Sequence, residues 1–199
     1  MNKIVDYGER LFLLVLAANF FYSIELNIRE QPLLILLAAS ELLPVVLILI
    51  RRPGQCTQEW LPFIYALLGT AAPLMVRPTE SPTFVIPVAL GGTLMLTGLI
   101  FNLTAKMALW RSFGLAPANR GVRVGGPYRL VRHPMYLGYF LTQLGFLFTN
   151  LTIGNAIKYL LAWSMQILRI REEEKFLLQD KAYRDLTRTV RFRLMPFIY

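Results

Sequence analysis

Runs of apolar residues are the feature that most constrains this chain. A helix needs about 20 consecutive apolar residues to cross the hydrocarbon core of a bilayer. Four runs reach or approach that length: Leu11–Ile28, Pro32–Ile50, Trp60–Val76 and Phe84–Leu109. Two more follow, Tyr136–Phe148, which is short, and Thr152–Ile170. The pattern predicts an all-α, polytopic integral membrane helical bundle with about six transmembrane helices. A bundle of five transmembrane helices is the alternative, because the first and fifth runs are the least certain to be spans.

The composition agrees with a membrane protein. Hydrophobic residues make up 55% of the 199 residues, yet the net charge is +9, and the mean hydropathy is +0.48. High apolarity with a basic balance indicates charges that sit in loops and tails. A secretory signal peptide is not expected, because Asp6 and Glu9 precede the first run and no small-residue cleavage site follows it. With one cysteine, Cys56, and one histidine, His133, neither a disulfide nor a cysteine-built metal site is expected.

The basic residues are distributed unevenly between the two sides of the expected bundle. With six spans, 18 of the 21 Lys and Arg fall on the side that holds both termini. Cytoplasmic segments carry the excess of Lys and Arg, so both termini are predicted to be cytoplasmic. The expected location is a bacterial inner membrane.

Two polar segments, Trp110–Pro134 and Arg169–Tyr199, are too long to be turns, and both fall on the cytoplasmic side. Only Asn150 and Leu151 separate the last two runs, which predicts a tight helical hairpin joining the two segments. We therefore divide the chain into N-terminal transmembrane helices, 1–109, and a core of loop, hairpin and cytoplasmic tail, 110–199. A functional site is expected where the loop and the tail meet.

The loop contains the lone histidine. Gly121, Gly125 and Gly126 allow close backbone approach to a ligand; the alternative is a linker whose arginines lie on anionic headgroups. Three interpretations of His133 stay open: an interfacial side chain, a general base, and a fixed contact to a bound ligand. Because Pro134 restricts the backbone of His133, a positioning role suits it better than proton transfer.

The tail begins with a run of charged residues that is expected to be helical. Arg169 and Glu173 are four residues apart and share a helix face. A polar stripe leaving a membrane helix is a candidate binding wall, and an exposed run of ion pairs is the alternative. Glu41 lies well inside an apolar run, where we expect a helix–helix contact first and a ligand route second.

Two motifs occur in order in this region. The pattern G-x-Y-x4-H-P-x-Y-x-G covers 126–138, the pattern R-x3-E-E-x-x-L covers 169–177, and YRDL and RFRLMP follow. Together they resemble the isoprenylcysteine carboxyl methyltransferase family, within the wider group of membrane methyltransferases that includes the phospholipid methyltransferases. The resemblance extends from about Arg111 to Pro196.

The resemblance implies a cofactor and a set of site residues. Family members transfer a methyl group from S-adenosyl-L-methionine, enclosed by the loop and the tail at the cytoplasmic face. By motif position, the implied cofactor-binding residues are Arg120, Gly121, Val122, Arg123, Tyr128, His133, Pro134, Met135, Tyr136 and Glu173. Arg169 matches an arginine that orients the methyl acceptor.

The implied acceptor is hydrophobic or membrane-embedded, and most like a prenylcysteine-type carboxylate. Methyl transfer needs alignment of two reactants more than a strong base, and a carboxylate is already ionised. Alternatives are a phospholipid or small-thiol methyltransferase, an NADPH-dependent membrane reductase, and a non-catalytic membrane protein. The expected partners are the acceptor and membrane lipids, with no nucleic acid. The oligomeric state stays open.

Overall fold

The structure, a computed structural model, describes residues 3–50, 60–80, 82–109 and 125–195. Over these ranges the regular secondary structure is helical only. The α-helices are α1 (Lys3–Asn27), α2 (Leu34–Ile50), α3 (Trp60–Leu74), α4 (Val88–Leu109), α5 (Pro134–Thr149), α6 (Ile153–Leu177) and α7 (Lys181–Thr189). The short 3-10 helix η2 (Gly126–Arg129) precedes α5. The all-α class predicted from the sequence is confirmed for the described residues.

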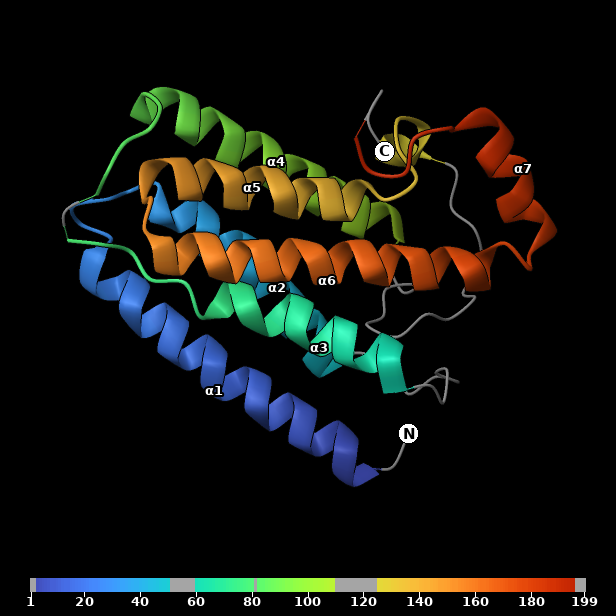
Figure 1. Ribbon diagram of the computed structural model, residues 1–199, viewed down its shortest axis with the longest axis horizontal. Coiled ribbons are helices and arrows are strands. Elements are labelled where there is room, and N and C mark those ends of the chain that lie inside the picture. Colours follow the sequence, from blue (N-terminus) through green and yellow to red (C-terminus); the bar gives the residue numbers. More distant parts are fainter. Residues whose placement is uncertain (1–2, 51–59, 81, 110–124, 196–199) are drawn as a thin grey trace.

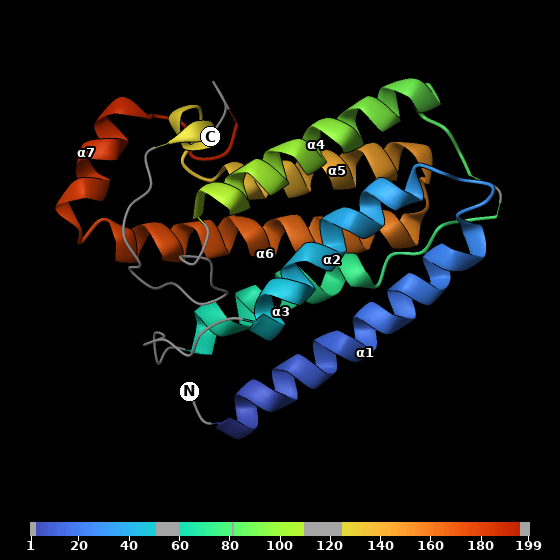
Figure 2. The ribbon, with the colours of Figure 1, turned by 180° about the vertical axis from the view of Figure 1, so that it is seen from behind.

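Helices α1 to α6 form one bundle in which successive helices run in opposite directions (Figures 1 and 2). The start of α1, the end of α6, η2 and the tail after α7 all lie at the same end of this bundle. Helix α7 lies beyond that end, outside the bundle. The alternation brings the described parts of both polar segments, 125–134 and 169–195, to one end of the bundle, as the sequence predicts.

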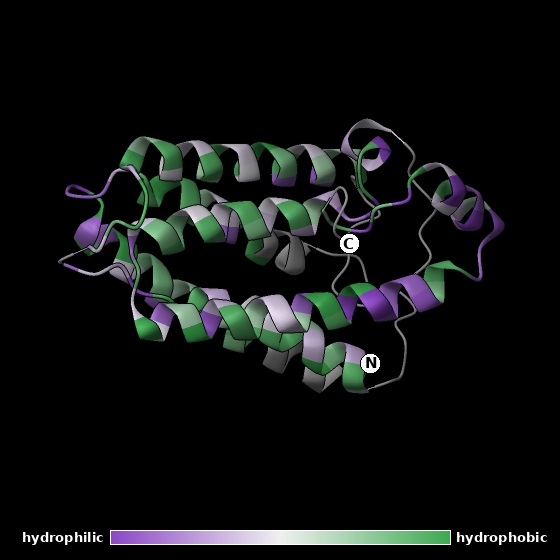
Figure 3. Ribbon diagram, turned by 45° about the horizontal axis from the view of Figure 1, so that its top comes forward, coloured by the Kyte–Doolittle hydropathy of each residue, from purple (hydrophilic) through white to green (hydrophobic). Residues whose placement is uncertain are grey.

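Every apolar run expected to be a helix is helical, but the lengths differ. Helix α6 continues past Ile170 to Leu177, so it carries the charged motif out of the apolar zone. Among the described residues one helix, Val88–Leu109, is long and apolar enough by length and composition to cross a membrane, and Leu11–Asn27 and Trp60–Leu74 are shorter apolar helices. Figure 3 shows apolar residues along the bundle and polar residues gathered at the end of α6 and on α7.

Helices α4 and α5 make the most extensive contact in the bundle, and small residues permit it. A Cβ on Gly98 would lie 2.5 Å from the backbone nitrogen of Thr142, and a Cβ on Gly138 would lie 2.6 Å from the backbone nitrogen of Asn102. Neither position has room for a side chain. Small residues are the usual means of close helix packing in membranes, and here Gly138, Thr142 and Gly145 pack α5 against α4 within one chain.

The predicted tight hairpin between α5 and α6 is present. Helix α5 ends at Thr149, and Thr152 caps α6 by accepting a hydrogen bond from the backbone N–H of Asn155 at 3.1 Å. The side chain of Asn155 in turn donates to the carbonyl of Arg77 at 2.8 Å, which ties the hairpin to the segment after α3. The hairpin sets α5 and α6 side by side, so the start of α5 and the end of α6 meet at the polar end of the bundle.

Candidate functional site

The loop before α5 and the tail after α7 are paired through their backbones. The N–H of Arg132 donates to the carbonyl of Phe192 at 3.0 Å, and the N–H of His133 donates to the carbonyl of Arg193 at 2.8 Å. The Arg132 guanidinium adds bonds to the carbonyls of Val190 at 2.9 Å and Arg191 at 2.8 Å. The loop and the tail therefore meet where the sequence places the site.

Glu174 is the buried centre of this junction, with 3% of its surface exposed. It accepts hydrogen bonds from Arg132 Nε at 2.7 Å and from Arg193 Nε at 2.5 Å. The hydroxyl of Tyr183, on α7, adds a third at 3.2 Å. Burial of Glu174 acts to raise its pKa, but the His133 ring and the Arg132 guanidinium outweigh burial and hold the pKa well below its usual range. One carboxylate thus joins α6, α7, the loop and the tail.

Glu173, the preceding residue, has different partners. Its Oε1 accepts a bond from the hydroxyl of Tyr136 at 2.6 Å and another from Arg169 Nε at 3.1 Å. The Arg169 guanidinium also lies over the Tyr136 ring, with Cζ 5.4 Å from the ring centroid. Among the described residues no hydrogen bond reaches Oε2 of Glu173, and 17% of the side chain is exposed. This carboxylate is positioned on one side and open on the other.

The His133 ring lies between the two carboxylates. Its Nδ1 is 3.9 Å from Oε2 of Glu173, and its Nε2 is 3.4 Å from Oε1 of Glu174. The Nε2 contact lacks hydrogen-bond geometry, so this buried nitrogen has no hydrogen-bond partner in the described part of the chain. His133 also caps α5, with Pro134 in the first turn. The backbone is fixed from both sides, while one ring nitrogen is left unsatisfied.

The other predicted loop residues surround this cluster. Gly126 has a φ of 60°, a left-handed conformation that glycine adopts without strain, and it begins the helix that carries Tyr128. Tyr128, Pro134 and Met135 are buried. Burial raises the pKa of the Tyr128 hydroxyl, and the charge of Glu173 adds to the rise. The predicted residues Arg120, Gly121, Val122 and Arg123 lie outside the described residues.

A small polar cleft continues from the site into the bundle. Tyr136 and Arg169 form its site end, and Glu41, Thr70, Tyr139, Gln143 and Gln166 line the rest. Glu41 accepts a bond from Gln143 Nε2 at 2.9 Å, and Gln143 Oε1 accepts one from Trp163 Nε1 at 2.9 Å. Glu41 therefore makes the helix–helix contact expected of it, between α2 and α5, and it also lines a space that reaches Arg169.

The sequence did not predict the ion pairs that Glu174 forms with Arg132 and Arg193. The sequence contains both the R-x3-E-E-x-x-L motif and the RFRLMP segment, but no pattern in it indicates which glutamate contacts which arginine. The available signal was the excess of arginines, Arg132 and Arg193 among them, over the run of three glutamates, Glu172 to Glu174.

Comparison with known families gives the site its context. Residues 85–179 match the sequence model of the isoprenylcysteine carboxyl methyltransferase family. These residues belong to that family. The matched range holds both motifs and the residues from Tyr128 to Glu174 described above. A search of the curated proteins found no match to the chain.

Membership in the isoprenylcysteine carboxyl methyltransferase family makes the chain's matched region that of a membrane methyltransferase, and members generally use S-adenosylmethionine. The described residues fit such a ligand. The cofactor offers hydroxyl and amino donors and several acceptors, and the site offers the open oxygen of Glu173 and the unsatisfied Nε2 of His133. Unsatisfied buried polar atoms in a native structure call for a partner.

Proposed function

We propose that this protein is an S-adenosylmethionine-dependent integral membrane methyltransferase that methylates a hydrophobic acceptor, most like a prenylcysteine-type carboxylate, to form a methyl ester. It crosses a bacterial inner membrane six times, with both termini and the cofactor site cytoplasmic, and residues 110–199 form its catalytic core. The observation that carries the proposal is the half-satisfied carboxylate of Glu173, which Tyr136 and Arg169 hold at the junction of loop and tail.

In this proposal His133, Tyr136 and Glu173 hold the cofactor. When bound, the cofactor supplies an electrophilic methyl group on a sulfonium. Glu173 Oε2 accepts hydrogen bonds from the cofactor, and Glu173 keeps its orientation through the Tyr136 hydroxyl at 2.6 Å. His133 contributes the ring nitrogen on the Glu173 side, Nδ1, which lies 3.9 Å from Oε2 of Glu173. Neither Glu173 nor His133 transfers a proton. Tyr128, on η2, and Met135, in the first turn of α5, complete the proposed cofactor-binding set.

Arg169 orients the acceptor. Its guanidinium is buried and is held over the Tyr136 ring with Nε on Glu173, and a planar guanidinium suits recognition of a carboxylate. Holding acceptor and methyl donor in a near-attack geometry accounts for about 7–11 kcal/mol of the barrier in favourable cases. The acceptor enters laterally from the bilayer, and its reacting end meets Arg169 at the site end of the cleft.

Calorimetric titration of the purified protein in detergent with S-adenosylhomocysteine tests the cofactor assignment. The wild type is expected to bind, and Glu173→Gln to bind about 10- to 100-fold more weakly, the loss expected for hydrogen bonds to a charged group. Glu172→Gln is the matched control, because Glu172 is the neighbouring glutamate and its ion pair in the described part of the chain is with the exposed Lys175 at 2.6 Å. Absence of binding by the wild type, or equal losses in both variants, would overturn the proposal.

Incubation of enriched membranes with methyl-labelled cofactor identifies the acceptor. A base-labile label in a lipid-like product supports a methyl ester on a carboxylate. A base-stable label in a phospholipid amine or a thioether points to the phospholipid or small-thiol alternatives and refutes the ester assignment. Binding of NADPH in competition with S-adenosylhomocysteine would favour the reductase.

A further inference from the structure

A groove runs along the outer side of the loop–tail junction, away from Glu173 and the polar cleft. One wall is formed by the C-terminal half of α4, the loop before α5 and the start of α5, and the other by the tail after α7. We call it the tail groove and define it by Phe101, Arg129, Leu130, Leu137, Arg191 and Phe192. Four of these six side chains are apolar and two are cationic, so the tail groove is amphipathic.

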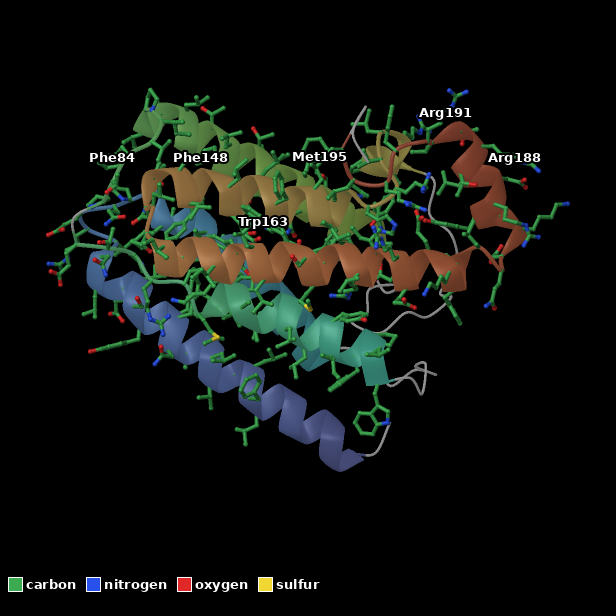
Figure 4. All side chains as sticks on the ribbon, viewed as in Figure 1. Phe84, Phe148, Trp163, Arg188, Arg191 and Met195 are labelled. Atoms are coloured by element: carbon green, nitrogen blue, oxygen red, sulfur yellow. The ribbon has the colours of Figure 1, made fainter. Side chains whose placement is uncertain are left out.

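The two arginines of the tail groove differ from those of the site. Arg132, Arg169 and Arg193 each contact Glu173 or Glu174. Arg129 and Arg191 are exposed, and among the described residues neither guanidinium lies within ion-pair distance of a carboxylate. Figure 4 shows Arg191 on the tail, on the outer side of the ribbon. The tail groove thus presents two uncompensated positive charges above an apolar wall.

The position of the tail groove suits a lipid headgroup. Helix α4 is the described helix that is long and apolar enough to cross a bilayer, and the groove lies toward its C-terminal end. Leu130, 59% exposed, and Ile100, 51% exposed, continue the apolar wall onto the outer surface. Basic side chains at the end of a spanning helix lie at headgroup level, where they attract anionic lipids.

We propose that the tail groove binds an anionic phospholipid from the surrounding bilayer. The acyl chains lie on Ile100, Phe101 and Leu130, and Arg129 and Arg191 contact the phosphate. The proposal goes beyond methyl transfer and requires only that α4 lies in the membrane.

Lipid binding in the tail groove has a consequence for the site. Arg129 and Leu130 come three residues before Arg132 and His133, respectively. Arg191 and Phe192 belong to the tail segment, and Arg132 bonds to the backbone carbonyls of both. One occupant of the groove therefore touches both segments whose pairing builds the site. An anionic lipid is expected to stabilise the closed junction of loop and tail.

Binding is measured with fluorescently labelled phosphatidylglycerol titrated into the purified protein in neutral detergent, with phosphatidylcholine carrying the same label as the comparison. We expect the wild type to prefer phosphatidylglycerol by roughly tenfold, given two basic contacts to the headgroup. The double variant Arg129→Gln/Arg191→Gln is expected to lose the preference, and the charge-preserving Arg129→Lys/Arg191→Lys to keep most of it.

The matched control is Arg171→Gln/Arg188→Gln. It removes the same charge from exposed positions on α6 and α7, outside the groove, and it is expected to keep the wild-type preference. Equal loss in the control, or full preference retained by the glutamine variant of the groove, would overturn the proposal. Displacement of the labelled lipid by inorganic phosphate alone would also overturn it, because the site would then be a simple anion site.

Thermal unfolding separates loss of the site from loss of the fold. In phosphatidylcholine vesicles the groove variant and the wild type are expected to melt together, and phosphatidylglycerol is expected to raise the Tm of the wild type only. A rise of equal size in both proteins contradicts the proposal. None of these measurements uses the methyl donor, so failure of the lipid site and failure of the methyltransferase assignment give different results.

Discussion

Glu173 and Glu174 are adjacent residues of one helix, and they do opposite things. Glu174 is 3% exposed and accepts from Arg132, Tyr183 and Arg193, which come from three other segments. Among the described residues, Glu173 accepts hydrogen bonds through Oε1, while Oε2 has the His133 ring 3.9 Å away. Successive residues of a helix point about 100° apart, so α6 directs one carboxylate into the loop–tail junction and the other toward α5 and the cleft. The comparison separates a carboxylate that joins four segments from one that keeps an oxygen without a hydrogen bond in the described part of the chain, the one to which we assign the ligand.

The largest effect is expected from Glu174→Ala. It leaves the buried Arg132 without its carboxylate partner, and breaking a buried ion pair costs about 3–5 kcal/mol. Thermal unfolding in detergent is expected to show a large fall in Tm together with loss of S-adenosylhomocysteine binding. A variant that melts like the wild type would contradict the structural role of Glu174 and remove the distinction between the two glutamates.

Acid is expected to weaken the same junction. The pKa of Glu174 in the folded protein lies below its ordinary value of 4.5. A carboxyl with a lowered folded-state pKa contributes stability above the unfolded-state value and loses it as the pH falls through the folded-state value. The Tm of the wild type is expected to fall as the pH drops below about 4.5. In Glu174→Gln that part of the pH dependence should be missing, and an unchanged profile would refute the assignment.

Tyr136→Phe tests the proposed ligand-binding role of Glu173. The substitution removes a hydroxyl that donates to Glu173 at 2.6 Å. A hydrogen bond to a charged group contributes about 1.5–3 kcal/mol, so S-adenosylhomocysteine affinity is expected to fall about tenfold or more. The Tm is also expected to fall, because Tyr136 and Glu173 are bonded in the unliganded protein. A fall in Tm without a change in affinity would assign Glu173 to the fold alone.

Tyr183→Phe is the matched change on the structural side, and it has the smallest expected effect. It removes a hydroxyl that donates to Glu174 at 3.2 Å, while both arginines remain. We expect a loss of about 1 kcal/mol of unfolding free energy, measured by denaturant or thermal unfolding, with cofactor affinity unchanged. If the two tyrosine variants behaved alike, the two carboxylates would not have separate roles.

Much of the molecule follows from local sequence. The apolar runs predict the helices of the bundle because a helix satisfies its own backbone and its length follows from the run. The spacing of Arg169 and Glu173 predicts their contact at 3.1 Å, since residues four apart share a helix face. His133 before Pro134 predicts a fixed backbone at the start of α5, and the paired motifs resemble a family to which residues 85–179 belong.

Other features were decided only by the tertiary structure. Arg132 and Glu174 are 42 residues apart, and Glu41 and Gln143 are 102 apart; no local pattern encodes such pairs. The choice between Glu173 and Glu174 depends on where the tail returns after α7, because only that return places Arg193 beside one of them. The sequence therefore determined which side chains were available at the polar end of the bundle. Packing of the tail against the loop determined that Arg132 and Arg193 pair with Glu174, while Glu173 pairs with Arg169 on its own helix, because each buried charge must find its partner in space.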